Sequence, residues 1–186
     1  MRSNNVFIEG TRFIFNTNFS GDPKRDTYGS SERKGNLIIP DPLMARELID
    51  EGFNVKMTKP REGDNPEEFA PTYYIVVRLS YRNRDGELKQ WPPKVFLITE
   101  DKTNELNEDT VSCIDYTWVE SVNVVLNKYE NPKTNKKTLY IKTMEVYQRV
   151  EDDPILARHR KSVNEGEDEP QDSVHFNPEN EEDIPF

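Results

Sequence analysis

Apolar and polar residues alternate most clearly over residues 72–82, and this pattern predicts a β-strand with two different faces. One face is apolar, while the other mixes basic, aromatic and small polar side chains. The apolar face holds Tyr73, Ile75, Val77, Leu79 and Tyr81, and the mixed face holds Tyr74, Val76, Arg78, Ser80 and Arg82. Residues 83–86, Asn-Arg-Asp-Gly, form a hairpin-turn signal, so the chain is expected to reverse there.

Shorter runs of β-branched and aromatic residues predict further strands. They cover residues 6–15, 37–39, 53–59, 95–99, 111–119, 121–129 and 139–149. Gly10 lies inside the first run and indicates a bulge or sharp bend, as a barrel strand needs. The polar stretches at 16–36, 60–71 and 100–110 are expected to be loops.

One helix is expected between the second and third of these strands. Asp41 is a good N-cap, Pro42 suits the first helical position and Gly52 follows the last turn, which predicts a helix over residues 42–51. We expect the helix to turn a set of apolar side chains towards the core. The set comprises Leu43, Ala45, Leu48 and Ile49.

These elements predict a mainly β body. Five or more strands, a bend-forming glycine and an inserted helix fit a small OB-like Greek-key β-barrel with extra strands. An eight-stranded sandwich fits the pattern nearly as well.

Charge divides the chain into two parts. The 186 residues carry 35 acidic and 25 basic side chains, a net charge of −10. Nine of the acidic residues and none of the basic ones lie in residues 162–186, so residues 1–161 hold 26 acidic against 25 basic. We therefore expect a folded domain over residues 1–150, and over residues 151–186 a short basic bridge followed by a disordered acidic tail.

Several classes of protein are disfavoured. Cys113 is the one cysteine, which excludes an internal disulfide and a cysteine-based zinc site, and it is expected to fill space in the core. Both histidines, His159 and His175, lie in or near the tail, away from any ligand cluster, so no metal or cofactor is predicted. With no phosphate-binding glycine motif or Ser-His-Asp candidate, the chain is not expected to be an enzyme. No membrane span or secretory segment is evident, which predicts a cytoplasmic protein; its oligomeric state is not predictable.

The mixed face of strand 72–82 suits single-stranded nucleic acid, which needs cations for phosphates and flat side chains for bases. An ordinary solvent-exposed sheet face would show the same residue types. Trp91 between polar and proline residues could be held at the surface for stacking, or could cap the edge of the core. The loop at 16–36 places aromatic residues among cations, and a basic turn follows at 131–137. The DNA-binding candidates are Phe19, Lys24, Arg25, Tyr28, Arg33, Lys34, Tyr74, Arg78, Arg82, Trp91, Lys94, Lys136 and Lys137.

Two further aromatic residues, Tyr116 and Trp118, are expected to share one face of a strand over residues 111–119. Core packing is the favoured interpretation for both.

The last residues, Asp183, Ile184, Pro185 and Phe186, follow a run of carboxylates. Two apolar side chains beside a proline suit docking into another protein's pocket. The motif and its acidic context resemble the C-terminal tip of bacterial single-stranded DNA-binding proteins. That resemblance implies an upstream OB-fold that holds DNA and a tip that binds replication, recombination and repair enzymes.

Several short segments of the body are similar to single-stranded DNA-binding proteins of tailed phages. They include residues 7–10, 52–56, 92–95, 114–115 and 122–124. The resemblance implies a non-enzymatic protein that coats single-stranded DNA during phage DNA replication, recombination or repair, in the cytoplasm of the bacterial host. The alternative is an interaction protein that mimics DNA and docks on host replication factors without binding DNA itself. Duplex DNA or RNA as the ligand also stays open.

Overall fold

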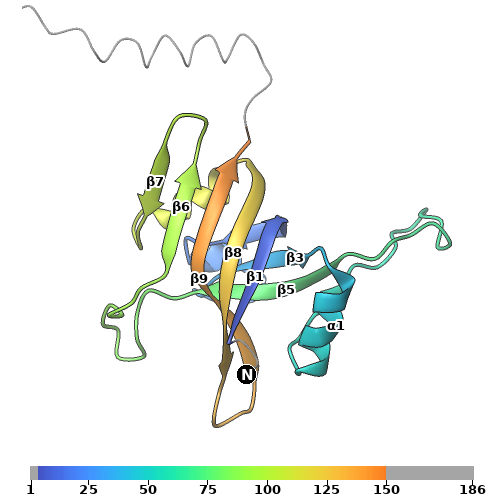
Figure 1. Cartoon of the computed structure of the whole chain (residues 1–186), viewed down its shortest axis with the longest axis horizontal. Coiled ribbons are helices and arrows are strands. Elements are labelled where there is room, and N and C mark those ends of the chain that lie inside the picture. Colours follow the sequence, from blue (N-terminus) through green and yellow to red (C-terminus); the bar gives the residue numbers. More distant parts are fainter. Residues whose placement is uncertain (1–3, 150–186) are drawn as a thin grey trace, which may run out of the picture. The chain divides into compact units, whose positions relative to one another are not determined.

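The structure, a computed structural model, describes residues 4–149 and shows a mainly β body, as expected (Figure 1). All nine strands of this part belong to one sheet. The strands are β1 (Asn5–Thr11), β2 (Phe13–Asn18), β3 (Arg33–Ile39), β4 (Lys56–Met57), β5 (Tyr73–Leu79), β6 (Lys94–Ile98), β7 (Thr103–Leu106), β8 (Val119–Glu130) and β9 (Lys137–Gln148). The helices are α1 (Pro42–Asp50) and two short 3-10 helices, η1 (Pro23–Arg25) and η2 (Val111–Tyr116). None of these helices is long and apolar enough to cross a membrane.

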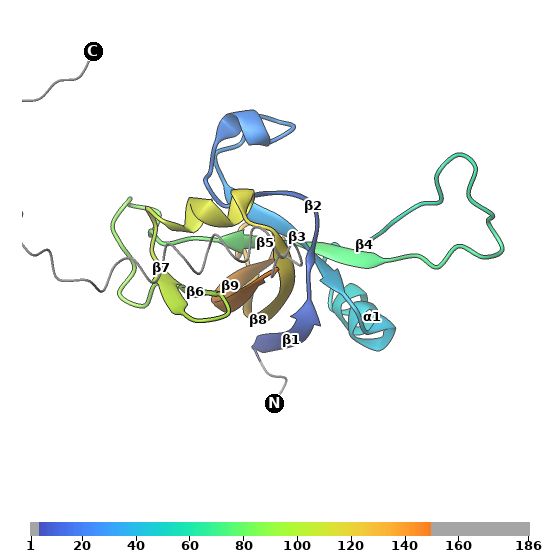
Figure 2. The same ribbon diagram turned by 90° about the horizontal axis from the view of Figure 1, so that it is seen from above.

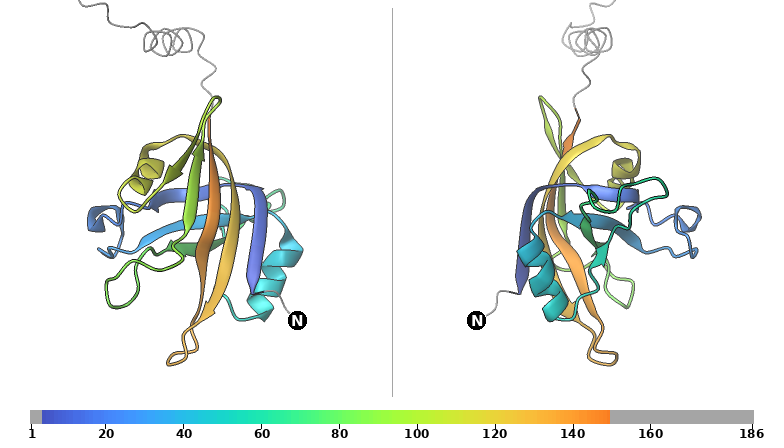
Figure 3. Two further views of the ribbon diagram at one scale, coloured as in Figure 1. Left: turned by 60° about the vertical axis from the view of Figure 1, so that its left-hand side comes forward. Right: turned by 90° about the vertical axis from the view of Figure 1, so that its right-hand side faces the viewer.

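The sheet closes into a ring in which the strands follow the order β1, β8, β9, β5, β3 and β2. β8 pairs with β1 and β9, β9 lies parallel to β5, and β3 joins β5 to β2. β2 continues directly from β1, so the two form one bent strand that pairs with β8 at its start and with β3 at its end. Such a ring favours the predicted OB-like barrel over a two-sheet sandwich. Figure 3 shows β6, β9, β8 and β1 side by side on one side of this ring.

The bend between β1 and β2 lies where Gly10 predicted it. Gly10 has φ of 63°, a left-handed conformation that favours glycine, and the register to β8 shifts between Ile8 and Thr11. The backbone N–H of Gly10 donates to the side chain of Asn123 on β8 at 2.8 Å. The hydroxyl of Thr11 donates to the carbonyl of Ile38 on β3 at 2.6 Å, and this links the bent strand to both neighbours.

Strand β5 confirms the two-faced pattern. Its inward side chains are buried: Ile75, Val77, Leu79 and, just beyond the strand, Tyr81 are each at most 5% exposed. The outward residues from Tyr74 to Ser80 are half-buried. The mixed face is therefore turned away from the core and accessible.

Helix α1 begins as predicted, since the Asp41 carboxylate accepts a hydrogen bond from the Leu43 N–H at 2.9 Å. Ala45 and Leu48 are buried, but Leu43 is 70% exposed and Ile49 is 48% exposed. The expectation that Leu43 and Ile49 face the core is wrong. The helical repeat of 3.6 residues puts only a narrow stripe through Ala45 and Leu48 on the core side.

Three segments differ from the predicted elements. The strand expected over 53–59 shortens to β4, and the loop expected over 100–110 contains β7. Residues 111–116 form η2 instead of a strand, with Val111 and Ile114 buried three positions apart. That spacing matches the repeat of a 3-10 helix, which the β-branched composition of the segment concealed.

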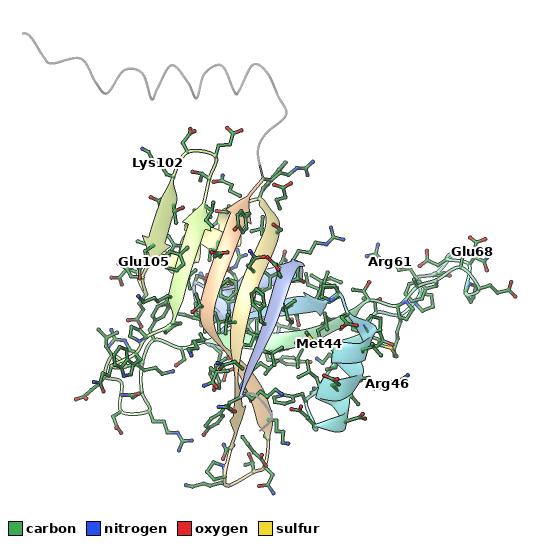
Figure 4. The ribbon with its side chains drawn as sticks, in the orientation of Figure 1. Met44, Arg46, Arg61, Glu68, Lys102 and Glu105 are labelled. Carbon is green, nitrogen blue, oxygen red and sulfur yellow. The ribbon has the colours of Figure 1, made fainter. Side chains whose placement is uncertain are left out.

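The loop between β4 and β5 extends away from the sheet (Figure 2). Its side chains include Arg61 and Glu68, which point outwards from the ribbon (Figure 4). These residues are not part of the face formed by β3 and β5.

The predicted division of the chain at residue 150 coincides with the end of the described residues. It stays a prediction.

Candidate nucleic-acid interface

The outward face of β3 and β5 carries paired side chains along its length. The register sets Lys34 opposite Arg78, Asn36 opposite Val76, and Ile38 opposite Tyr74. All six are half-buried. Cations therefore occupy one end of the face, and flat or apolar groups occupy the other.

Phe15 on β2 extends the apolar end of this face. Its ring packs edge-to-face on Tyr74, with centroids 5.4 Å apart and planes at 80°. Phe15 is 61% exposed and has φ of 63°, an unfavourable conformation for a bulky residue. Backbone strain of this kind gathers at functional sites, where the surrounding structure imposes it. The sequence placed Phe15 in a regular strand and gave no signal of this geometry.

A second aromatic group lies beside the cationic end. Tyr140 on β9 is the parallel partner of Arg78, and its ring packs on Tyr129 with centroids 5.8 Å apart. The ammonium of Lys89 lies 5.7 Å from the Tyr140 ring, and Arg84 donates to the Tyr129 hydroxyl at 2.9 Å. Burial lowers the pKa of Lys89. The turn at 83–86 and the β8–β9 hairpin thus meet next to Arg78, which the sequence did not predict.

The carboxylate of Asp115 in η2 fixes the start of the loop over residues 19–32. This side chain is shielded from solvent and accepts hydrogen bonds at 2.8 Å from the backbone N–H groups of Phe19 and Ser20 and from the Thr17 hydroxyl. Arg25 lies 3.7 Å from the same carboxylate. Charge-assisted hydrogen bonds to a buried carboxylate hold the backbone more firmly than neutral ones. The loop is therefore anchored at its base.

The expectation that Phe19 is an exposed DNA contact is wrong. The ring is fully buried and packs edge-to-face on Phe13 at 5.3 Å. It lies against Gly35, where an added Cβ would come within 3.2 Å of it. Because Gly35 has no side chain, the Phe19 ring has room to pack in the core at this position.

The cations of the loop are largely held by other groups. Arg25 donates to the carbonyls of Thr17 and Asp115 and lies 5.0 Å from the Tyr116 ring. Lys34 pairs with Asp26, and this hydrogen bond lowers the pKa of Asp26 to about 2. Lys24 and Tyr28 are exposed, with Tyr28 at 93%.

The predicted arginines of β5 are also paired. Arg78 lies 3.3 Å from Glu32, and Arg82 donates from Nε to both carboxylate oxygens of Glu108 at 2.9 and 3.0 Å. The hydrogen bond with Glu108 raises the pKa of Arg82. Arg33 donates to the carbonyl of Phe19. Strands β3 and β5 thus place Arg33, Lys34 and Arg78 close together at one end, with Arg82 just beyond β5 and Tyr74 towards the other end.

The remaining candidates lie elsewhere. Lys94 starts β6, whose partner is the later half of β9, and Trp91 is 84% exposed in the preceding loop. Lys137 donates to the carbonyl of Glu51 behind α1, while Lys136 is exposed in the turn. The tip residues Asp183–Phe186 lie outside the described residues. DNA contacts by Trp91, Lys94, Lys136 and Lys137, and partner binding by the tip, stay predictions.

Tyr116 and Trp118 do not pack in the core, contrary to expectation, since each is 72% exposed. The helical turn of η2 directs Tyr116 outwards, beside Arg25 of the loop, and Trp118 follows in the segment between η2 and β8. Cys113 is half-buried against the core, as expected, and burial raises the pKa of its thiol.

A cavity of about 530 Å³ lies between α1 and β1, away from the face of β3 and β5. Its lining includes Glu47, Asp50 and Glu51 around Phe7 and Met44. Figure 4 shows Met44 on α1. Carboxylates around this cavity make it unsuitable for a polyanion.

Comparison with protein families matches residues 1–184 to the family model described as "Putative phage ssDNA-binding domain". The chain therefore belongs to this family of phage single-stranded DNA-binding proteins, which bind DNA and are not enzymes. No curated protein matches the chain.

Solved structures with some likeness include proteins of two phages. The single-stranded DNA-binding protein of bacteriophage Enc34, truncated at its C-terminus, is 13% identical with a TM-score of 0.45, over 81% of this chain and 88% of that one. The same protein in complex with single-stranded DNA is 14% identical with a TM-score of 0.42, over 82% and 90%. The single-stranded DNA-binding protein gp2.5 of bacteriophage T7 is 16% identical with a TM-score of 0.39, over 79% and 87%.

Replacing Asp115 with alanine should release the loop over residues 19–32. The N–H groups of Phe19 and Ser20 would lose a charged acceptor, so their hydrogen exchange should accelerate about tenfold or more. Exchange followed by mass spectrometry on peptides covering residues 17–32 measures this. The variant Asp109→Ala, at an exposed position just before η2, is the control. Unchanged protection of Phe19 and Ser20 would show that Asp115 is not the anchor, and retained protection in β8 shows that the body stays folded.

Proposed function

We propose that the chain binds single-stranded DNA along the outward face of β3 and β5, between the loop over residues 19–32 and the β8–β9 hairpin. The observation that carries this proposal is the edge-to-face pair of the exposed Phe15 and the half-buried Tyr74, with Phe15 in a strained backbone conformation. The pair adjoins the cations of the same face. The face as a whole therefore offers π-surfaces to bases and guanidinium groups to phosphates.

Binding of this kind is tolerant of sequence. Every base has a π-face, so stacking on Tyr74, Phe15 or Tyr140 does not distinguish bases strongly. Phosphate neutralisation by Lys34, Arg78 and their neighbours releases counterions and makes the affinity fall steeply with salt. The near balance of charge over residues 1–161 does not oppose this, because local patches of charge decide where a polyanion docks.

Phosphates would compete with carboxylates on this face. Glu32 is paired with Arg78 at 3.3 Å, and its side chain is 49% exposed. An exposed ion pair is worth little, so a phosphate can replace Glu32 at low cost. Until DNA binds, the ion pair with Glu32 holds the Arg78 side chain in position.

Membership of the family supports the following proposed biological role. The protein coats single-stranded DNA during phage DNA replication, recombination or repair, in the cytoplasm of the host. Its tip, Asp183 to Phe186, recruits partner enzymes by inserting Ile184 and Phe186 into a pocket with a basic rim. Support for the tip comes from its sequence: apolar residues and a proline after a run of carboxylates.

Replacing Tyr74 with alanine should weaken binding to oligo-dT about 10- to 100-fold, because one stacked base contributes about 1–3 kcal/mol. Fluorescence anisotropy of labelled oligo-dT at low salt measures this. The control is Phe7→Ala, which removes an aromatic ring that is 57% exposed on β1, beside α1. Equal losses in the two variants would argue against the β3–β5 face, and absence of wild-type binding at low salt would refute DNA binding itself.

A chain that ends at Lys161 should bind oligo-dT as tightly as the full chain, or more tightly. The truncation removes nine acidic side chains and no Lys or Arg. Repulsion between the protein and the phosphates therefore decreases, and the effect is largest at low salt. A full-length chain with those nine residues changed to Asn or Gln separates charge from length. Loss of binding on truncation would mean that the tail itself belongs to the DNA site.

A further inference from the structure

A second cavity, of about 260 Å³, lies where β3 begins and β5 ends. It combines three guanidinium groups with the hydroxyl groups of Ser31, Ser80, Tyr81 and Tyr140. Its polar lining includes Arg33, Arg78, Arg82, Ser31, Ser80 and Tyr81. Arg78 also lies on the outward face of β5, so the cavity adjoins the proposed path of the strand.

Tyr81 is the least satisfied polar group of this cavity. The residue is only 5% exposed, yet its hydroxyl makes no hydrogen bond within residues 4–149. Nε of Arg78 is likewise buried without a partner among the described residues. Buried donors of this kind are rare because each loses its hydrogen bonds to water without replacement. Both residues line the same cavity, and a ligand with acceptor oxygens that enters it can supply the missing partners.

The hydroxyl of Tyr81 is a donor at any physiological pH. Burial raises the pKa of Tyr81 to about 12, so the group stays protonated and neutral. It can donate a hydrogen bond to an anionic oxygen without adding repulsion.

The charges around the cavity leave one positive charge uncompensated. Glu32 and Glu108 also line it, but Arg78 lies 3.3 Å from Glu32 and Arg82 lies 2.9 Å from Glu108. Arg33 instead donates to a backbone carbonyl, that of Phe19. Three arginines against two carboxylates give the lining of the cavity a net positive charge, which suits a phosphodiester.

We propose that this cavity is a phosphate subsite, in which one backbone phosphate of the bound strand is held by Arg33, Arg78 and the Tyr81 hydroxyl. The proposal rests on the proposed binding of single-stranded DNA. A phosphate fits the cavity better than a base does, because a base needs broad flat walls, and of the two aromatic residues in the lining Tyr81 is only 5% exposed. The subsite fixes the register of the strand relative to the aromatic groups, with a neighbouring base placed over Tyr140.

The test replaces Tyr81 with phenylalanine, which removes only the hydroxyl. The control is Tyr73→Phe, since Tyr73 starts β5 and has the same inward alternation as Tyr81, which lies just beyond the end of that strand. Each variant of the full chain is titrated with oligo-dT and with an oligomer of the same length made of abasic tetrahydrofuran units. We expect Tyr81→Phe to weaken binding about tenfold on both oligomers, as loss of a hydrogen bond to a charged group implies, and Tyr73→Phe to match the wild type.

The other outcomes separate the two proposals. If the wild type binds oligo-dT and Tyr81→Phe binds equally well, the phosphate subsite is wrong while DNA binding stands. If the loss appears with oligo-dT but not with the abasic oligomer, the cavity holds a base. If the wild type does not bind oligo-dT, both proposals fail. Thermal unfolding of Tyr81→Phe without DNA should be unchanged or shifted upwards, since an unsatisfied buried hydroxyl has been removed.

Discussion

The bend at Gly10 is the constraint on which the barrel depends. A straight strand over residues 5–18 could pair with β8 or with β3, but not with both. Because Gly10 takes φ of 63° and its N–H is bound by Asn123, the chain leaves β8 and continues along β3 as β2. The ring of strands then closes. The paired strands β3 and β5 form one side of it, with one face towards the core and the other accessible. Loss of this turn would remove the surface to which DNA is proposed to bind.

Departures from ordinary protein geometry gather around that open face. Phe15 is strained and exposed, and Tyr81 and Arg78 keep buried donors without partners within residues 4–149. Most of the body obeys the usual rules of burial and pairing, with a continuous core from Val6 to Val146. Such violations are expected at a binding site, where a ligand supplies the missing contacts. The ion pair between Arg78 and Glu32 fits the same view, since a phosphate can replace the carboxylate.

The sequence predicted those features that depend on local chemistry. The alternation in β5, the bend at Gly10, the turn at 83–86 and the cap at Asp41 each follow from a few neighbouring residues. The structure contains each of these features at the predicted residues.

Features that depend on distant contacts were missed. Phe19 looked like a loop aromatic because its pocket against Gly35 is formed by another strand. Tyr116 and Trp118 looked like core residues because alternation over 111–119 hid a 3-10 helix. Asp115 gave no signal, since its partners lie nearly a hundred positions away in the chain. The cluster of Tyr140, Tyr129 and Lys89 likewise comes from three separate segments.

The central claim is that the strand lies on the outward face of β3 and β5. Ultraviolet crosslinking of the full chain to oligo-dT, with the modified residues located by mass spectrometry, tests it most directly. The account predicts crosslinks at Phe15, Tyr74 and Tyr140. Crosslinks confined to Phe7 and other residues beside α1, with none on β2, β5 or β9, would contradict it.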